Sequence, residues 1–115
     1  MTSGQGDGPM PGEVAYALAK GALAQITPTV AAELAGRGIR VNTVNPGPVQ
    51  TGYLDHAMWD YLEPMFPFGR YGFPDDPARL IAWLATDDGE WVTGQVIAST
   101  GGFPWQVRPT DPRLA

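Results

Sequence analysis

The sequence predicts an α/β fold in which short parallel strands alternate with helices. Apolar residues recur at helical spacing from Glu13 to about Gly36, and a second helical pattern begins at Asp75. Two runs rich in β-branched residues, 39–44 and 92–98, each follow one of these helical segments and are bounded by turn residues. Strands that alternate with helices along a chain join in parallel through crossover connections, so the pattern favours a parallel sheet covered by helices.

The first twelve residues are rich in glycine, contain two prolines and are predicted to form a loop. The long helix that follows is predicted from apolar residues at steps of four: Val14, Leu18, Ala22, Ile26, Val30 and Leu34. Gly36 and Gly38 supply its stop signals. Pro28 conflicts with this helix because it lacks a backbone donor and clashes with the preceding turn, at a cost of about 3 kcal/mol. We therefore expect the helix to kink at Pro28, and the sequence leaves open whether it continues beyond that residue.

Residues 39–44 are predicted to form a buried parallel strand that ends at Pro46-Gly47-Pro48. Ligands of open α/β sheets bind outside the carboxyl ends of the strands. The segment from Pro46 to Thr51 therefore becomes a candidate ligand contact. The alternative is an ordinary turn in which Thr51 caps the next helix.

Residues 52–68 are dense in aromatic and apolar side chains, which suits either a pocket lining or a core. His56 lies in this stretch without ligand-like neighbours in sequence and is interpreted as a pocket-lining or surface residue rather than a catalyst. Asp75-Asp76-Pro77 opens another helix, because acidic residues favour the positive helix end and proline suits its first turn. That helix is expected to end at 87–89, followed by the strand 92–98 and a turn at Gly101-Gly102.

Composition narrows the classes of function. The chain has 115 residues, 43% of them apolar, which suits one domain. A net charge of −5 argues against a nucleic-acid partner, whose phosphates would repel such a surface. The absence of cysteine excludes disulfides and thiolate chemistry, no metal site is expected, and a cytoplasmic location fits. No apolar run approaches the ~20 residues of a membrane span, and the amino terminus does not read as a signal peptide.

Tyr16 and Lys20 are four residues apart, so on a helix they share one face. The pKa of a free phenol is near 10, and an adjacent cation favours the phenolate, which suits proton exchange near neutral pH. Ser3, thirteen residues upstream of the tyrosine, could orient a substrate carbonyl against the phenol. The plainer alternative is a tyrosine packed at a helix end and a solvated lysine.

Four motifs in order resemble those of the short-chain dehydrogenases/reductases. They are Thr2-Ser3-Gly4 ahead of the tyrosine, VNTVNPGPVQT at 41–51, FGRYGFPDDPA at 68–78, and TGQVI through Gly101-Gly102-Phe103 at 93–103. Within the family, the sequence resembles members labelled 3-oxoacyl-(acyl-carrier-protein) reductases. The resemblance covers all but the tail from Pro104 to Ala115.

The resemblance implies the carboxy-terminal half of a Rossmann-like doubly wound parallel sheet, with residues 1–115 forming part of a single domain and 104–115 its tail. The family's glycine-rich phosphate turn follows its first strand. Residues 4–8 (GQGDG) follow no apolar strand and do not meet that requirement. They are interpreted as a mobile loop after the serine, and the first half of the fold, with its glycine-rich turn, is read as absent.

The resemblance also implies site residues. Ser3 would bind the substrate carbonyl, Tyr16 would transfer the proton, and Lys20 would acidify the phenol and bind the nicotinamide ribose. The residues implied to contact NAD or NADP, with no preference between them, are Tyr16, Lys20, Pro46, Gly47, Val49 and Thr51. The substrate would be a small carbonyl compound or alcohol, and the full-length form a homo-oligomer that packs through its long helix.

The competing hypothesis is a chain without catalysis of its own. Ser3 is preceded only by Met1 and Thr2, so nothing local is expected to hold its oxygen precisely. A truncated, inactive fragment, or an interaction module that docks through its long helix without binding a dinucleotide, would have the same sequence pattern.

Overall fold

The computed structural model describes residues 1–104, so the predicted tail lies outside the described residues except for Pro104. The elements are, in order, η1 (Gly4–Gly6), α1 (Val14–Leu34), η2 (Ala35–Arg37), β1 (Thr43–Asn45), α2 (His56–Leu62), η3 (Glu63–Met65), α3 (Asp75–Leu84), η4 (Asp87–Gly89) and β2 (Val96–Ala98). Each helix and strand predicted from the sequence is present, and η1 adds a short turn within the segment predicted as a loop.

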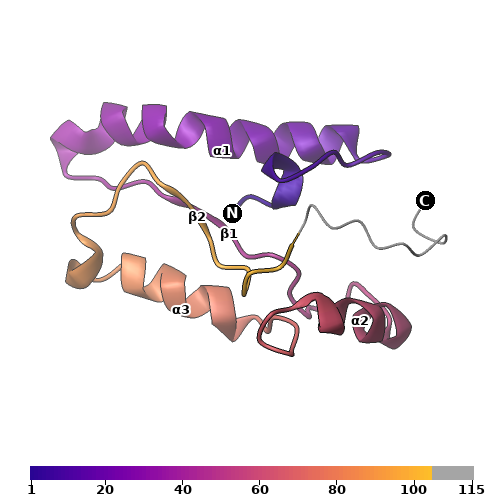
Figure 1. Ribbon diagram of the computed structural model, residues 1–115. Helices are drawn as coiled ribbons and strands as arrows, with labels where there is room; N and C mark the ends of the chain where they lie inside the picture. Colours follow the sequence, from indigo (N-terminus) through magenta and orange to yellow (C-terminus); the bar gives the residue numbers. More distant parts are fainter. Residues whose placement is uncertain (105–115) are drawn as a thin grey trace.

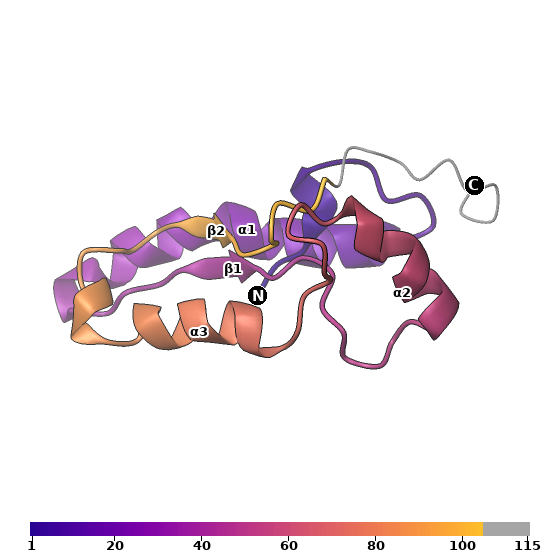
Figure 2. The same cartoon turned by 60° about the horizontal axis from the view of Figure 1, so that its bottom comes forward.

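The described elements form three layers, with α1 on one face of the strands and α3 on the other (Figures 1 and 2). β1 and β2 are parallel, with Val44 paired to Ile97 at the centre of the register. Helix α2 lies beyond the carboxyl ends of the strands, at the end of the molecule where the first loop also lies (Figure 1). The predicted α/β fold with a parallel sheet is confirmed.

The amino terminus joins the free edge of β1. The Thr2 amide donates a hydrogen bond of 2.9 Å to the Val44 carbonyl, while Thr43 and Asn45 bond toward β2. Thr2 is buried, and its hydroxyl donates to the Lys20 carbonyl at 2.9 Å. β1 and α1 therefore both hold the residue before Ser3, while the expectation that the Ser3 oxygen itself is not held precisely stays a prediction.

Helix α1 runs unbroken from Val14 to Leu34 with Pro28 inside it, so the doubt about its second half was misplaced. Tertiary contacts hold this part of the helix. The Thr27 hydroxyl donates to the Leu23 carbonyl at 2.6 Å and shares a buried hydrogen bond of 2.6 Å with the Thr43 hydroxyl on β1. A Cβ on Gly94 would lie 3.5 Å from Ala31 and 3.7 Å from Pro28, so the helix lies close against the β2 segment.

From Val14 to Ile26, the apolar residues that predicted α1 face outward rather than toward the sheet, whereas Val30 and Leu34 are half-buried. Val14 and Leu18 are 79% and 73% exposed, whereas Thr27 and Ala31 are buried. Small side chains allow the helix to approach the strands closely, so the sheet side of α1 is made of small residues. The large apolar residues are left uncovered within the described chain.

Both strands are shorter than predicted because side chains take over part of the ladder. The Val41 amide donates to the Thr93 hydroxyl at 3.1 Å, and the Asn42 side chain bonds the Val92 carbonyl at 2.8 Å and the Gln95 amide at 3.1 Å. Arg40 donates to the carbonyls of Leu84 and Gly89 at 2.6 and 2.9 Å, which ties the strand entry to the end of α3.

The predicted turn at Gly101 and Gly102 is confirmed, with φ values of +62° and +76° that glycine adopts readily. None of the helices within residues 1–104 combines the length and apolar character needed to cross a bilayer.

Candidate active site

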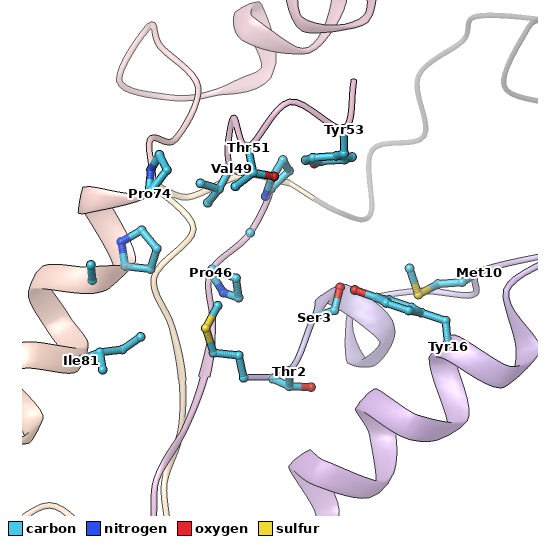
Figure 3. A pocket seen from close by; sticks show the side chains of 15 residues that line it. Thr2, Ser3, Met10, Tyr16, Pro46, Val49, Thr51, Tyr53, Pro74 and Ile81 are labelled. Atoms are coloured by element: carbon cyan, nitrogen blue, oxygen red, sulfur yellow. The ribbon is translucent and has the colours of Figure 1, made fainter. Parts of the chain in front are cut away.

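A cavity of about 590 Å³ opens at the carboxyl ends of the strands, between the amino terminus, α1, the loop after β1 and α3 (Figure 3). Most of its lining is apolar. The residues around it are Met1, Thr2, Ser3, Met10, Tyr16, Pro46, Gly47, Pro48, Val49, Thr51, Tyr53, Pro74, Pro77, Ala78 and Ile81. All of the site residues predicted from the sequence belong to this set except Lys20.

Ser3 and Tyr16 come from different elements and meet at one wall of the cavity. Ser3 follows the Thr2 anchor in an extended conformation, and its amide donates to the Gln5 side chain at 3.1 Å. Tyr16 lies in the first turn of α1 and is 42% exposed. In Figure 3 the two hydroxyls point toward the same part of the cavity.

Lys20 lies one helical turn behind the phenol. Its Nζ is 5.7 Å from the centroid of the Tyr16 ring and donates a hydrogen bond of 3.2 Å to the Met1 carbonyl. The ammonium therefore faces the ring, as the spacing of four predicted, while the Met1 carbonyl holds it outside the cavity lining. This bond also ties α1 to the amino-terminal segment that carries Ser3.

The loop after β1 forms the opposite wall and is held from three sides. The Asn45 side chain accepts the Gly47 amide at 3.1 Å. Gly47 has a φ of +66°, and a Cβ there would lie only 2.9 Å from the Thr100 Cβ. Val49 pairs with Gly72, whose carbonyl accepts the Gln50 amide at 2.9 Å.

The alternative role of Thr51, as the cap of the next helix, does not apply. Asp55 caps α2 instead, because its side chain accepts the Met58 amide at 2.8 Å.

The motif at 68–78 supports this loop from behind. Arg70 makes a two-pronged ion pair with Asp76, with Nη–Oδ distances of 2.7 and 2.8 Å, and Asp76 also accepts the Phe73 amide at 2.8 Å. The hydrogen bonds from Arg70 and then from the Phe73 amide hold the pKa of Asp76 well below its usual range. The ion pair thus closes the turn that presents Gly72 to the cavity loop.

Four hydroxyl groups line the cavity without a hydrogen bond to any other group in residues 1–104. They belong to Ser3, Tyr16, Thr51 and Tyr53. A few unpaired polar groups that converge in an apolar cavity are typical of a small-molecule site. The first three were predicted from the sequence, but the fourth was not, because its aromatic segment suited a core equally well.

Tyr53 is held by an aromatic cluster. Its ring meets Trp59 edge to face, with centroids 5.8 Å apart, and Trp59 in turn lies 4.8 Å from Tyr71. Trp59 is 1% exposed, and its indole nitrogen has no partner among the described residues. Burial, and then the nearby Tyr16 phenol, raise the pKa of Tyr53.

His56 begins α2 as an exposed residue and does not line the cavity.

The cavity fits the nicotinamide end of a dinucleotide. Its volume, its apolar walls and its unpaired hydroxyls suit a flat ring with a polar carboxamide, and the Pro46–Thr51 loop presents backbone and a free hydroxyl to it. Within residues 1–104, no three His, Cys, Asp or Glu side chains gather in a way that could hold a metal ion.

The sequence was compared with known families and proteins. The family model described as "Enoyl-(Acyl carrier protein) reductase" matches residues 1–104. An uncharacterized oxidoreductase of Bacillus subtilis, YjdA, is 54% identical over 103 residues, which cover 90% of this chain and 41% of YjdA. The 3-oxoacyl-[acyl-carrier-protein] reductase FabG of Thermotoga maritima is 42% identical over 96 residues, which cover 81% of this chain and 39% of FabG.

Solved structures agree with these matches. The angucycline C-6 ketoreductase LanV with bound NADP has a TM-score of 0.79 at 33% identity, over 90% of this chain and 41% of LanV. The chain thus spans about two fifths of the length of the relatives it matches.

Proposed function

Because the chain belongs to the short-chain dehydrogenase/reductase family, we propose that its cavity is the active site of an NAD(P)-dependent oxidoreductase that reduces carbonyl compounds or oxidises alcohols. The observation that supports this most directly is the meeting of Ser3 and Tyr16 in one apolar cavity, with Lys20 behind the phenol. We further propose that residues 1–115 are the carboxy-terminal part of one domain.

Ser3 would donate a hydrogen bond to the substrate carbonyl and hold it toward Tyr16. In the reducing direction, the O–H bond of Tyr16 breaks and its proton passes to the carbonyl oxygen, which becomes an alcohol. In the oxidising direction, the phenolate takes the alcohol proton. The ammonium of Lys20 lies 5.7 Å from the ring centroid, so its positive charge is near the phenol in both directions.

NAD or NADP would be held by Tyr16 and Lys20 at one wall and by Pro46, Gly47, Val49 and Thr51 at the other. The bound nicotinamide supplies or accepts the hydride. LanV was solved with NADP, which supports a nicotinamide dinucleotide here without choosing between the two coenzymes.

The protein would act on a small molecule, since the cavity volume of about 590 Å³ is within the range of small-molecule sites. We also propose that it forms a homo-oligomer. The uncovered apolar stripe on α1, defined as Val14, Leu18, Leu23 and Ile26, would supply the contact, since each of these side chains is more than two fifths exposed.

Titration with NADH and NADPH tests the proposal. Nicotinamide fluorescence should change and saturate below millimolar coenzyme, and added ketone should then consume the reduced form. The control variant is Tyr61→Phe, which removes a phenol that does not line the cavity and should bind coenzyme as the unchanged protein does. Absence of saturable binding would instead favour the competing hypothesis, a chain without independent dinucleotide binding that acts through its long helix.

A further inference from the structure

Among the described residues that line the cavity, Tyr53 carries the one unpaired hydroxyl that the proposed reaction does not use. Ser3 and Tyr16 serve the reacting oxygen, and Thr51 serves the cofactor. Tyr53 lines the same cavity, and Figure 3 shows it on the wall that faces Ser3 and Tyr16. Its hydroxyl has no hydrogen-bond partner within residues 1–104, so a ligand could take that bond without breaking another.

The orientation of Tyr53 is restrained although its side chain is 59% exposed. Trp59 meets the ring edge to face at 5.8 Å, with an interplanar angle of 82°. Trp59 is fully buried and also packs against Tyr71, so its own position is fixed. Any rotation of the Tyr53 ring would therefore break its contact with Trp59. A ring that packs against a buried neighbour and carries an unpaired hydroxyl at the cavity is preorganised to contact a ligand.

The hydroxyl also keeps its proton. The pKa of Tyr53 is raised above its ordinary value, by burial first and by the Tyr16 phenol second. Below the ordinary tyrosine pKa near 10, the group is therefore a donor, and this capacity is lost only as the pH rises through the raised value.

Resting on the proposed function, we propose that Tyr53 is a substrate-positioning residue that donates a hydrogen bond to a second oxygen of the substrate. The substrate class that fits is a mainly apolar carbonyl compound with another oxygen a few bonds from the reacting carbonyl, such as a diketone, a hydroxyketone or a keto ester. A simple ketone offers the Tyr53 hydroxyl no second acceptor, so its complex would lack this hydrogen bond.

Matched ketones test this assignment. We would measure the Kd of 1-phenyl-1,2-propanedione against propiophenone, and of 1-phenyl-1,3-butanedione against butyrophenone, by calorimetry. Oxidised coenzyme is present throughout so that no ketone is consumed. In the protein with its native Tyr53, at least one diketone should bind more tightly than its partner, and Tyr53→Phe should lower that preference by about 3- to 10-fold, the value of one neutral hydrogen bond.

Tyr61→Phe is the control and should keep the preference, because Tyr61 lies on α2 but does not line the cavity. A general loss of structure would weaken both ketones of a pair and leave their ratio unchanged. The assignment is overturned if neither diketone is preferred, or if Tyr53→Phe leaves every ratio within twofold. A Tyr53-dependent preference without any ketone reduction would contradict the proposed reaction while leaving the Tyr53 contact supported.

Discussion

Tyr16 and Lys20 share a helix face, yet they are placed differently with respect to the cavity. The phenol lines it, whereas the ammonium lies behind the ring and donates to the Met1 carbonyl. A single lysine therefore supplies positive potential to the phenol and also joins α1 to the segment that carries Ser3. If the proposed mechanism holds, Lys20→Ala would affect both the proton step and the attachment of the amino-terminal segment to α1.

Tyr16→Phe should reduce turnover by roughly 10²- to 10⁴-fold, because it removes the proposed general acid. Coenzyme affinity should change little, since the ring and its contact with Lys20 remain. Steady-state kinetics and a fluorescence titration measure the two quantities separately. Unchanged turnover in Tyr16→Phe would refute the role of this residue.

Asp76→Asn should destabilise the protein at pH 7 and less so in acid. The pKa of Asp76 is lower in the folded state than its ordinary value near 4, so its ionised form contributes stability above that value and loses it as the pH falls. Urea unfolding at pH 7 and pH 3 would show that the gap, which is the difference in free energy of unfolding between the unchanged protein and Asp76→Asn, is smaller at pH 3. Asp75→Asn is the control, because Asp75 is the exposed neighbouring residue and makes no ion pair within residues 1–104. An equal gap at both pH values would exclude the ion pair as its source.

The loop after β1 is the element on which the cavity depends most. Thr100 approaches Gly47 from the end of β2, and Gly72 pairs with Val49 from the segment before α3. Both approaches are so close that a Cβ on either glycine would overlap a neighbouring atom. The nearest atom would be 2.9 Å away at Gly47 and 3.0 Å away at Gly72. Two segments far apart in sequence thus hold the same six-residue wall.

Gly47→Ala should lower the free energy of unfolding by about 1–3 kcal/mol more than Gly52→Ala does. Both glycines have positive φ, +66° and +89°, so both substitutions strain the backbone. Only Gly47 also meets Thr100, since a Cβ on Gly52 would have no neighbour within 4 Å. Chemical denaturation of the two variants isolates the steric contribution. Equal losses would mean that the loop can move away from Thr100.

The whole molecule leaves much apolar surface uncovered. Six apolar residues are buried in the described chain: Ala31, Val44, Val49, Trp59, Phe66 and Leu84. The apolar stripe on α1 lies on the side away from the sheet, where contact with another surface would remove it from water. Burial of such residues stabilises by roughly 25 cal/mol per Å² of apolar area.

Leu18→Glu should reduce the molar mass measured by light scattering, if α1 forms the contact of a homo-oligomer. Leu18 is 73% exposed, so the substitution places a charge on the stripe without disturbing the fold. Ala82→Glu, at an exposed position on α3, should leave the mass unchanged. A monomeric starting protein at micromolar concentration would contradict the proposed assembly.

Local features of both fold and site could be predicted because they follow from backbone periodicity. The spacing of Tyr16 and Lys20 placed them on one helix face, and Asp75-Asp76-Pro77 marked the start of α3 correctly. The order of helices and β-branched runs was sufficient for a parallel sheet. The Pro46–Thr51 loop was identified because the carboxyl ends of strands are where such sheets bind ligands.

The remaining features depend on contacts between distant segments, which periodicity does not encode. The bond from Thr2 to Val44, the choice of the small-residue side of α1 for packing, and the continuity of α1 through Pro28 all follow from how closely the helix approaches the sheet. Tyr53 is a candidate only in the tertiary structure, where its ring packs at the cavity against Trp59, which in turn packs against Tyr71. The sequence was therefore enough to place neighbouring residues on one helix face, whereas the walls of the site arise from three-dimensional packing, because their close approaches join residues up to about fifty positions apart.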